Sequence, residues 1–472
     1  MNPQSVADFT GRSKELAQLN KLADSGNSQL VPIYGRRRVG KTELILRFLK
    51  NRKGLFYLGK ESPAPLQIQD FLRHAAGVLD EPLLEMIAVE DWKTALRTVV
   101  SKRPTDKGPF VLVLDEFQWM ANTSPDLPSI LQELWDHEWK KAGDIFLILC
   151  GSYLGFMERE VLGSKSPLFG RRTAQILLRP FDYQESALFH PRLSLPDRAR
   201  VYFLCGGIPY YLRFFSDQES VAKGIRENFL NVHAALYREP EFLLREELRE
   251  LQNYHAILTS IANGSLTAKE ISKRGGIPER SLPYYMNNLI ELGYVARRYP
   301  LTGKKANTRN VHFTIEDAVL RFWFRFVFPN TSRITRLGPA ASYQKIVAPE
   351  LDSYFGLCFE RLCQEALPNL LVAEGNEEEI EVGEYWDKNS QIDLVAHRSD
   401  GEIDLAECKW GTIKSWPKLR DELQSKVSAY PNPNNLTIRP RLFTRQKPPA
   451  SAAKLTEQGI AIHSLSSLYP DG

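Results

Sequence analysis

The sequence predicts an α/β protein of several domains, and three observations support this fold class. Up to about residue 180, apolar runs typical of buried strands alternate with helical stretches, which predicts a parallel sheet covered on both faces. From about residue 252, three short helical segments precede two strands, and beyond residue 345 a helix precedes a second group of strands. The chain of 472 residues is also too long for one hydrophobic core, and its length suggests about three domains.

Composition describes an ordinary globular chain. Hydrophobic residues make up 43% of it and charged residues 25%, which excludes a disordered or fibrous protein. The net charge of +4 is mild, so nucleic-acid binding has to be argued from local clusters of cations. The N-terminal segment lacks the pattern of a secretory signal, and no apolar run approaches the ~20 residues of a membrane span. The five cysteines form no Cys-x-x-Cys pair and suit buried thiols. We therefore expect a cytoplasmic protein without a membrane partner.

The first domain is expected to cover residues 1–190. Its strands are four short apolar runs bounded by polar residues or glycine, at 30–34, 55–58, 110–115 and 145–151. Residues 191–250 contain no comparable run and are expected to form helices with polar faces.

A phosphate-binding loop follows the first of these strands. Gly35-Arg36-Arg37-Arg38-Val39-Gly40-Lys41-Thr42 fits the pattern G-x-x-x-x-G-K-[ST]. The glycines let backbone N–H groups point inward at phosphate oxygens, and the helix that begins at Lys41 adds its positive dipole end. Lys41 is expected to reach the β- and γ-phosphates, and the Thr42 hydroxyl to bind Mg²⁺. The sequence therefore predicts that the chain binds and hydrolyses ATP with Mg²⁺.

Later strands of the same sheet supply the partners of this loop. Asp115 ends the strand at 110–115, where it is expected to hold Mg²⁺, and Glu116 follows where a base can polarise the attacking water. Ser152, after the strand at 145–151, is placed to touch the γ-phosphate or the water. Arg171 and Arg172 are candidates for an arginine finger that acts on a neighbouring copy, which would require a homo-oligomer. The alternative for these two arginines is an ordinary solvated surface.

These motifs resemble the P-loop ATPases of the AAA+/STAND type that are common in archaea. The matching segments run in order over roughly residues 8–215 and read FTGR, GRRRVGKT, VLVLDEFQW, LILCGSYLGFM, PLFGRRT and GGIPYYL. The resemblance implies that residues 191–250 form a helical lid, in which Gly207-Ile208-Pro209 contacts nucleotide. It also implies a hydrolytic role for Glu116 and a sensor role for Ser152.

Residues 251–330 show the winged-helix pattern. Helical segments at 254–262, 268–274 and 281–292 precede two strands within 294–315 that are joined by a polar, basic turn. The third helix would be the recognition helix, and cations on the hairpin suit contacts to phosphates of DNA. Those cations are Arg297, Arg298, Lys304, Lys305 and Arg309. A protein-interaction module with a solvated basic loop is the alternative. A buried aromatic helix at 318–327, ended by Pro329-Asn330, is expected to follow.

Residues 345–472 carry a second candidate active site. Asp393 lies on one predicted strand, and Glu407 and Lys409 lie on the next, where residues two apart share a face. Asp393 and Glu407 can therefore meet around Mg²⁺, with Lys409 placed to assist the attacking water and Glu360 completing the acidic cluster from the preceding helix. The alternative is that these are exposed charges at strand ends or an inactive relic.

The order Glu, Asp, Glu-x-Lys resembles the PD-(D/E)xK nuclease superfamily, which implies an α/β restriction-endonuclease-like domain. The whole chain also resembles a family of prokaryotic ATPases fused to a nuclease-like domain, with the segment FTIEDAVLRFWFRFVFPN at 313–330 as a further match. The first hypothesis is thus an ATPase that acts on DNA and gates a Mg²⁺-dependent nuclease. There are two alternatives. One is a STAND-type regulatory switch with a protein partner, and the other is a DNA-binding regulator in which the tail, residues 345–472, does not cleave.

Overall fold

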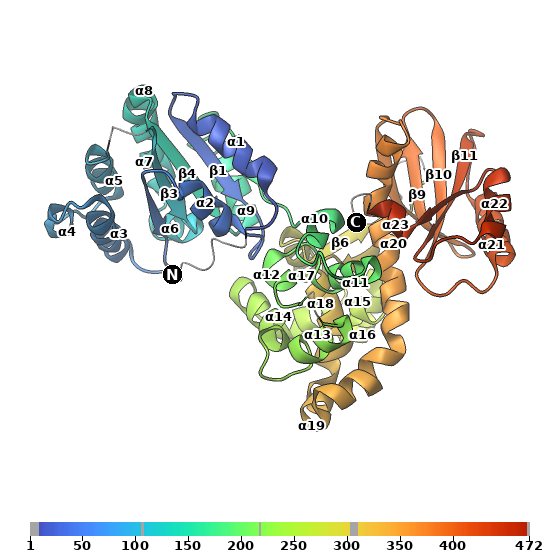
Figure 1. Ribbon diagram of the computed structural model, residues 1–472. Coiled ribbons are helices and arrows are strands. Elements are labelled where there is room, and N and C mark those ends of the chain that lie inside the picture. Colours follow the sequence, from blue (N-terminus) through green and yellow to red (C-terminus); the bar gives the residue numbers. More distant parts are fainter. Residues whose placement is uncertain (1–8, 105–107, 217–218, 303–309, 470–472) are drawn as a thin grey trace. The chain divides into compact units, whose positions relative to one another are not determined.

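The computed structural model describes residues 9–104, 108–216, 219–302 and 310–469 (Figure 1). The chain divides into two compact units: the first is Met1–Phe181 with Ile208–Tyr210, and the second is Asp182–Gly207 with Tyr211–Gly472. Lys304, Lys305 and Arg309, predicted to decorate the hairpin, lie outside the described residues. Within the part of the chain that is described, no helix is long and apolar enough to cross a membrane.

The first unit contains a parallel sheet of five strands in the order β2-β3-β4-β1-β5. The predicted strands are confirmed to within one residue at their starts. They are β1 (Gln29–Tyr34), β2 (Gly54–Leu58), β3 (Phe110–Asp115) and β4 (Ile145–Gly151), whereas the short β5 (Ile176–Leu177) was not predicted. Because β4 pairs with both β1 and β3, the carboxyl ends of these three strands lie side by side.

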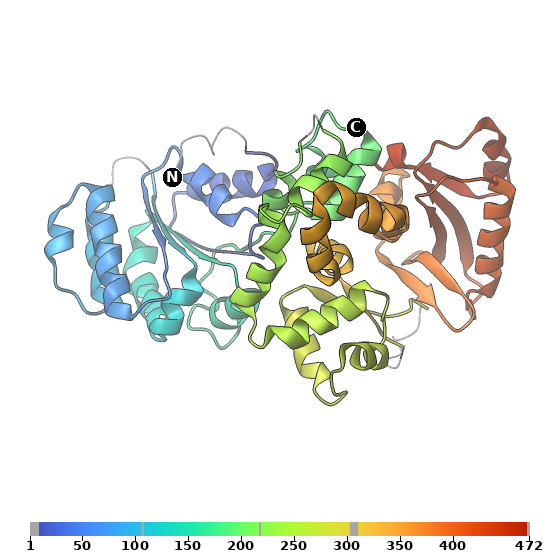
Figure 2. The ribbon, with the colours of Figure 1, turned by 90° about the horizontal axis from the view of Figure 1, so that it is seen from below.

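Helices cover both faces of this sheet (Figure 2). Leu112 and Leu114 of β3 face one layer, where Phe71, Trp92 and Leu131 belong to the same buried core. On the other face Phe48 packs against Phe146 of β4, with ring centroids 5.1 Å apart. The helices of this unit are α1 (Ser13–Ala23), α2 (Lys41–Leu49), α3 (Ala64–Leu79), α4 (Leu83–Met86), α5 (Trp92–Ser101), α6 (Phe117–Thr123), α7 (Leu127–Leu134), α8 (Lys140–Ala142) and α9 (Leu154–Phe156).

The second unit begins with helices and contains the predicted helix–hairpin segment. Three helices and an antiparallel hairpin occur in the expected order: α15 (Leu251–Ala262), α16 (Ala268–Gly275), α17 (Leu282–Glu291), β6 (Val295–Arg298) and β7 (His312–Ile315). The helices before them are α10 (Tyr183–Ala187), α11 (Leu195–Cys205), α12 (Pro209–Leu212), α13 (Val221–Asn228) and α14 (Ala235–Glu247).

The aromatic helix after the hairpin differs from the prediction at its end. It comprises α18 (Ala318–Phe322) and a π-helical turn at Trp323–Val327, but Pro329-Asn330 does not terminate the helical path. A 3₁₀ turn (Phe328–Asn330) leads directly into α19 (Thr331–Ser342). Proline in a first helical turn removes no internal hydrogen bond, which explains why the chain continues as helix.

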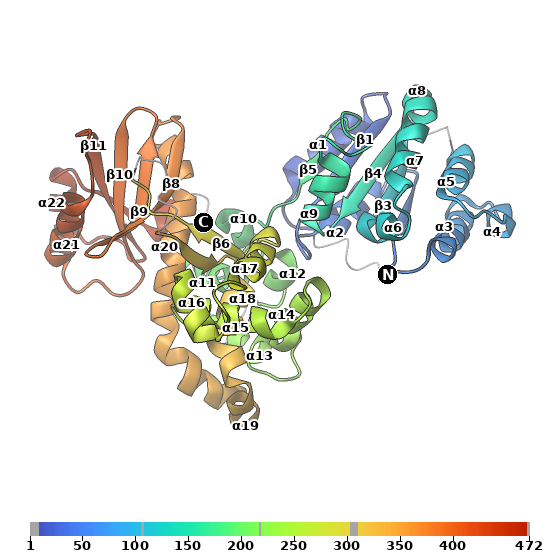
Figure 3. The same ribbon diagram turned by 180° about the vertical axis from the view of Figure 1, so that it is seen from behind.

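A mixed five-stranded sheet follows the long helix α20 (Ala348–Ala373), in the order β12-β11-β10-β9-β8. The strands β8 (Ile380–Trp386), β9 (Gln391–Arg398) and β10 (Glu402–Lys409) are antiparallel, whereas β10, β11 (Thr437–Thr444) and β12 (Ala461–Ser464) are parallel. The edge strand β8 is labelled in Figure 3. Helix α21 (Trp416–Ala429) covers one face and α20 the other, with α22 (Ala453–Glu457) and α23 (Leu465–Leu468) at the C-terminal end.

Candidate functional site

The loop between β1 and α2 depends on two glycines. A Cβ atom at Gly35 would lie 2.2 Å from the carbonyl oxygen of Leu178. Gly40, the residue before α2, has a φ of +93°, a backbone conformation that side chains other than hydrogen disfavour. Glycine at these two positions therefore allows the chain to curl tightly before the helix begins.

Lys41 folds back over this loop. Its Nζ donates hydrogen bonds to the carbonyl oxygens of Gly35 at 2.8 Å and Arg36 at 3.0 Å. Burial lowers the pKa of Lys41, while nearby groups that include the carboxylates of Glu116 and Asp115 act in the opposite direction. The loop carbonyls thus occupy the hydrogen-bonding positions that phosphate oxygens would take on a bound nucleotide.

Thr42 and Asp115 meet at the carboxyl ends of the strands. The Thr42 hydroxyl donates to Asp115 Oδ2 at 3.0 Å, and Asp115 is only 2% exposed. The other carboxylate oxygen accepts the backbone N–H of Glu116 at 2.9 Å. Hydroxyl and carboxylate oxygens are the ligands that Mg²⁺ prefers, so this pair fits the predicted ion.

Glu116 belongs to a group of three polar side chains. The Ser152 hydroxyl donates to Glu116 Oε2 at 2.7 Å, and the Gln118 amide donates to the same carboxylate oxygen. Gln118 also donates to the Ser152 hydroxyl at 3.2 Å, so the three side chains hold one another in place. Gln118 was missed in the sequence, although an amide between the apolar residues Phe117 and Trp119 is an unusual residue there.

Arg12, in the segment FTGR, donates a hydrogen bond to the backbone of the phosphate loop. Its guanidinium donates to the carbonyl oxygens of Val39 at 3.0 Å and Arg179 at 2.6 Å, and lies 3.9 Å from the centre of the Phe181 ring. Arg12 is 5% exposed. No role was predicted for Arg12, because its partners Val39 and Arg179 lie far along the chain.

Pro209 lies against the same loop within the first unit. Its Cγ is 3.9 Å from the place where Gly40 would carry a Cβ atom. Next to it, the Arg38 guanidinium lies 4.8 Å from the centre of the Tyr210 ring. Pro209 and Tyr210 therefore lie against the phosphate loop, and a contact of Gly207-Ile208-Pro209 with nucleotide stays a prediction.

The comparisons with known proteins agree with this geometry. A family model described as an ATPase domain predominantly from Archaea matches residues 9–215, and one described as archaeal and bacterial proteins of unknown function matches residues 323–419. An uncharacterized protein of Methanocaldococcus jannaschii is 31% identical over 413 residues, which cover 86% of this chain and 88% of that protein. The chain belongs to this family of archaeal-type ATPases. As a member of the family, the ATPase binds nucleotide.

Two solved structures show a weaker likeness to the ATPase. The Walker-type ATPase of Pyrococcus abyssi is 20% identical with a TM-score of 0.48, covering 68% of this chain and 97% of that one. The ORC2 protein of Aeropyrum pernix is 14% identical with a TM-score of 0.44, covering 71% of this chain and 98% of that one.

Arg171 and Arg172 of the ATPase are held by their own unit. Arg171 forms a bidentate ion pair with Asp136, in which Arg171 Nη2 lies 2.8 Å from Asp136 Oδ2. Arg172 donates to the carbonyl oxygen of Leu162 at 3.0 Å. The neighbouring Thr173 pairs with Leu30 near the start of β1, whereas the phosphate loop follows the end of that strand. An arginine-finger role in a second copy stays a prediction.

The tail of the ATPase brings Asp393, Glu407 and Lys409 together. The register that pairs Ala406 with Leu394 sets Asp393 beside Glu407, and Asp393 Oδ2 accepts the backbone N–H of Cys408 at 2.9 Å. Lys409 Nζ lies 2.5 Å from Glu407 Oε1. Both carboxylates are nearly buried, with 8% of Asp393 and 3% of Glu407 exposed.

A second lysine, Lys426 on α21, lies between the two carboxylates. It forms a close ion pair with Glu407 Oε2, and its Nζ is 3.7 Å from Asp393 Oδ1. The ammonium thus occupies the position where a cation shared by both carboxylates would sit. The sequence interpretation missed Lys426, because a lysine in a charged helix gives no signal of its tertiary partner.

Glu360 approaches this cluster from α20. Burial, followed by the charge of Asp393, raises the pKa of Glu360 to about 8. Burial and the charge of Glu407 raise the pKa of Asp393 to about 6. Burial acts to lower the pKa of Lys409, but the hydrogen bond to Glu407 and the charges of Glu407 and Asp393 together outweigh burial and raise it. Across the described ranges, no group of three or more His, Cys, Asp or Glu residues is arranged to hold a metal ion, so a cation here would rest mainly on Asp393 and Glu407.

The helix and hairpin predicted to contact DNA use many of their polar groups internally. Arg298 pairs with Glu316 at 2.9 Å, and Arg297 donates to Asn287 at 2.6 Å. Asn288 of α17 donates to the hydroxyl of Tyr254, whereas Tyr284 is 65% exposed. These contacts stabilise residues 251–330, whereas the exposed Tyr284 side chain is among those that can contact a binding partner.

Proposed function

We propose that the ATPase hydrolyses ATP with Mg²⁺, and that the nucleotide controls a Mg²⁺-dependent phosphodiesterase in residues 345–472 that acts on DNA. The phosphate-loop geometry supports the first step. Lys41 would exchange its two loop carbonyls for β- and γ-phosphate oxygens, and Thr42 and Asp115 would hold the ion. Bound Mg²⁺ supplies charge stabilisation at the phosphates.

Hydrolysis also needs an oriented water. Glu116 is the base in this proposal, and Ser152 and Gln118 fix its carboxylate through the hydrogen bonds they donate to one oxygen. Through Pro209, a nucleotide-dependent change in the phosphate loop would move the helices of the lid, residues 191–250. In an oligomer, Arg172 is the better finger, since Arg171 already holds Asp136.

The convergence of Asp393 and Glu407 on one cation carries the nuclease proposal. Two nearly buried carboxylates that share a positive charge form a donor set that fits Mg²⁺. Asp393 and Glu407 would hold the ion, which polarises the phosphodiester and the attacking water when bound. Lys409, on the same face of β10, would orient that water, and residues 251–330 would bind DNA as a winged helix.

The position of Lys426 favours a second candidate function. If Lys426 keeps the place of the cation permanently, the tail does not cleave, and the chain is a regulatory ATPase switch or a DNA-binding regulator. The two proposals therefore differ on whether a divalent ion can replace the ammonium.

Two assays test these proposals separately. For hydrolysis, Glu116→Gln should bind ATP as wild type does but turn it over at least about 100-fold more slowly, as expected for loss of a general base. For cleavage, plasmid and linear DNA with Mg²⁺ or Mn²⁺ should be cut by wild type and by Glu377→Ala, an exposed control. Glu407→Ala should not cut. Equal cutting by Glu407→Ala, or no cutting by wild type, would support the silent tail.

A further inference from the structure

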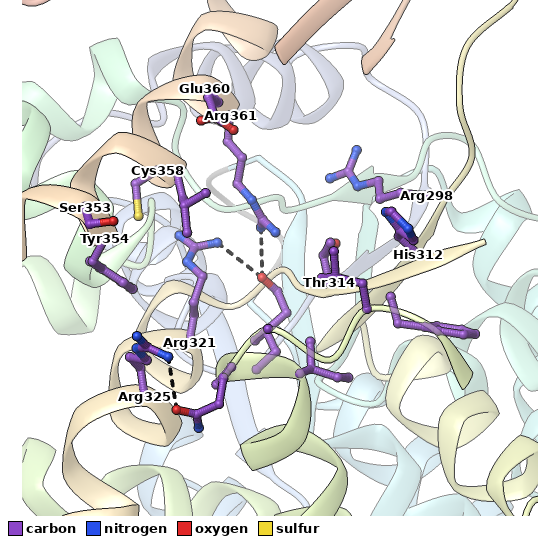
Figure 4. Close-up of a pocket in the computed structure, with 18 of the residues that line it drawn as sticks. Arg298, His312, Thr314, Arg321, Arg325, Ser353, Tyr354, Cys358, Glu360 and Arg361 are labelled. Carbon is purple, nitrogen blue, oxygen red and sulfur yellow. Dashed lines mark hydrogen bonds between the residues drawn. The ribbon is translucent and has the colours of Figure 1, made fainter. Parts of the chain in front are cut away.

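A cavity of about 580 Å³ lies within the second unit, walled by α15, the β6–β7 hairpin, α18, α20 and β8 (Figure 4). This volume lies in the range of sites for small organic ligands. Ser353 and Leu357 of α20 line it and are exposed, so the cavity is open to solvent along that helix. Neither the phosphate loop nor the Asp393–Glu407 pair forms its lining.

Four arginines line the cavity: Arg298, Arg321, Arg325 and Arg361. Arg321 and Arg361 donate to the same carbonyl oxygen, that of Ile315, at 3.2 and 2.8 Å, as Figure 4 shows. Burial and the charge of Arg321 lower the pKa of Arg361 to about 10, which indicates that these guanidinium groups repel each other.

Carboxylates compensate these arginines only in part. Although burial acts against ionisation, Arg361 and Arg298 lower the pKa of Glu316 to about 2, so this one carboxylate serves both arginines. Arg325 pairs with Glu350. Burial raises the pKa of Glu360 to about 8 and also raises the pKa of Glu384. Among the described residues, Arg298 and Arg361 share Glu316 and Arg325 pairs with Glu350, whereas Arg321 forms no ion pair with a carboxylate.

Two buried polar groups of the wall lie next to each other, because the Tyr354 hydroxyl interacts with the Arg321 guanidinium closely enough for each to shift the pKa of the other. Within the described part of the chain, neither the Tyr354 hydroxyl nor Arg321 Nε makes a hydrogen bond of good geometry. Tyr354 is only 6% exposed and lines the cavity. Buried donors nearly always have a hydrogen-bond acceptor, and the oxygen atoms of a ligand would accept hydrogen bonds from these two groups.

Part of the remaining wall is apolar and aromatic. Phe313 and Leu266 contribute apolar surface, and His312 stacks on Trp386 with ring centroids 4.1 Å apart and an angle of 9° between the rings. An inorganic anion would leave this surface uncovered. The combination suits an anion joined to a planar, partly apolar group.

We propose that this cavity is a second nucleotide-binding site, which takes a nucleoside phosphate with its phosphate on Arg298, Arg321 and Arg361. The Tyr354 hydroxyl donates to the same phosphate, and the base lies along the apolar wall. The ligand is either a free mononucleotide or one residue of a nucleic-acid strand. Glu360 lines the cavity as well as approaching the acidic cluster, so a strand held here would lie next to Asp393 and Glu407.

The test measures binding by calorimetry in the full-length Lys41→Ala variant, in which the phosphate loop does not retain nucleotide. The probes are AMP, dTMP and a single-stranded DNA octamer, all without divalent metal. We expect mononucleotide binding that Arg298→Gln weakens by about 10-fold, the effect of losing one charge-assisted hydrogen bond. Leu357→Trp, at the cavity mouth, should weaken it as well. Arg336→Gln, which removes an exposed arginine from α19 outside the cavity, should not.

The outcomes separate the two ligand sources and are independent of cleavage. If the octamer displaces the mononucleotide, the cavity takes a strand; if it does not, the ligand is a free nucleotide. Absence of binding by all three probes would overturn the proposal, as would binding that Arg298→Gln and Leu357→Trp leave unchanged. Failure of the nuclease proposal would not alter these measurements, because no probe has to be cut.

Discussion

At the scale of single residues, the state of the tail depends on which cation lies between Asp393 and Glu407. Removing Lys426 takes away the ammonium that lies between the two nearly buried carboxylates and leaves only Lys409, which pairs with Glu407, so the fold is destabilised. We predict that Lys426→Ala lowers the melting temperature, and that Mg²⁺ then raises it by more than it raises that of wild type. The control is Lys418→Ala, since Lys418 lies on the same helix and its side chain is 79% exposed. Equal Mg²⁺ shifts in Lys426→Ala and wild type would contradict a metal site.

Glu360 should make stability depend on pH. Its pKa is raised from 4.5 to about 8, so the folded state holds a proton that the unfolded state releases between these values. The contribution of Glu360 to the free energy of unfolding is therefore fully present below about pH 4.5, and it decreases as pH rises towards 8. Glu360→Gln, which stays neutral, should flatten this decrease, whereas Glu377→Gln should keep it. Thermal unfolding between pH 5 and 9 measures the difference, and parallel curves for wild type and Glu360→Gln would contradict the assignment.

At the scale of elements, Arg12 joins the start of α1 to the phosphate loop at Val39 and to the segment after β5 at Arg179. Arg12→Ala would leave the carbonyl oxygens of Val39 and Arg179 without this donor. We expect a loss of about 2 kcal/mol in the free energy of unfolding, the effect of removing hydrogen bonds from a charged donor. ATP affinity should fall too, because the loop loses its support. Chemical denaturation and ATP titration check this, with Lys14→Ala on the exposed side of α1 as control.

The elements also show how far sequence reasoning reaches. The strands at 110–115 and 145–151 were predictable to the residue, because each is an unbroken apolar run bounded by polar residues or glycine. Pro329 was misjudged, since proline stops a helix only when it falls after the first turn. Arg12 and Lys426 could not be assigned, because their roles depend on partners that the fold brings from distant positions.

At the scale of the whole molecule, we propose that ATP bound in the first unit controls chemistry in the second. Family membership establishes the nucleotide-binding domain, and the convergence of Asp393 and Glu407 supports the chemistry. If the lid segment around Pro209 transmits the state of the phosphate loop, ATP should change the tail's activity without any change in the tail's own residues.

The most direct test measures DNA cleavage in Mg²⁺ with and without ATP, for wild type, Lys41→Ala, Lys50→Ala and Glu407→Ala. Lys50 is exposed at the end of α2 and serves as the matched control. We predict that ATP changes the cleavage rate of wild type and Lys50→Ala, that it has no effect on Lys41→Ala, and that Glu407→Ala does not cut. Cleavage by wild type that is the same with and without ATP, or that persists in Glu407→Ala, would contradict the central claim.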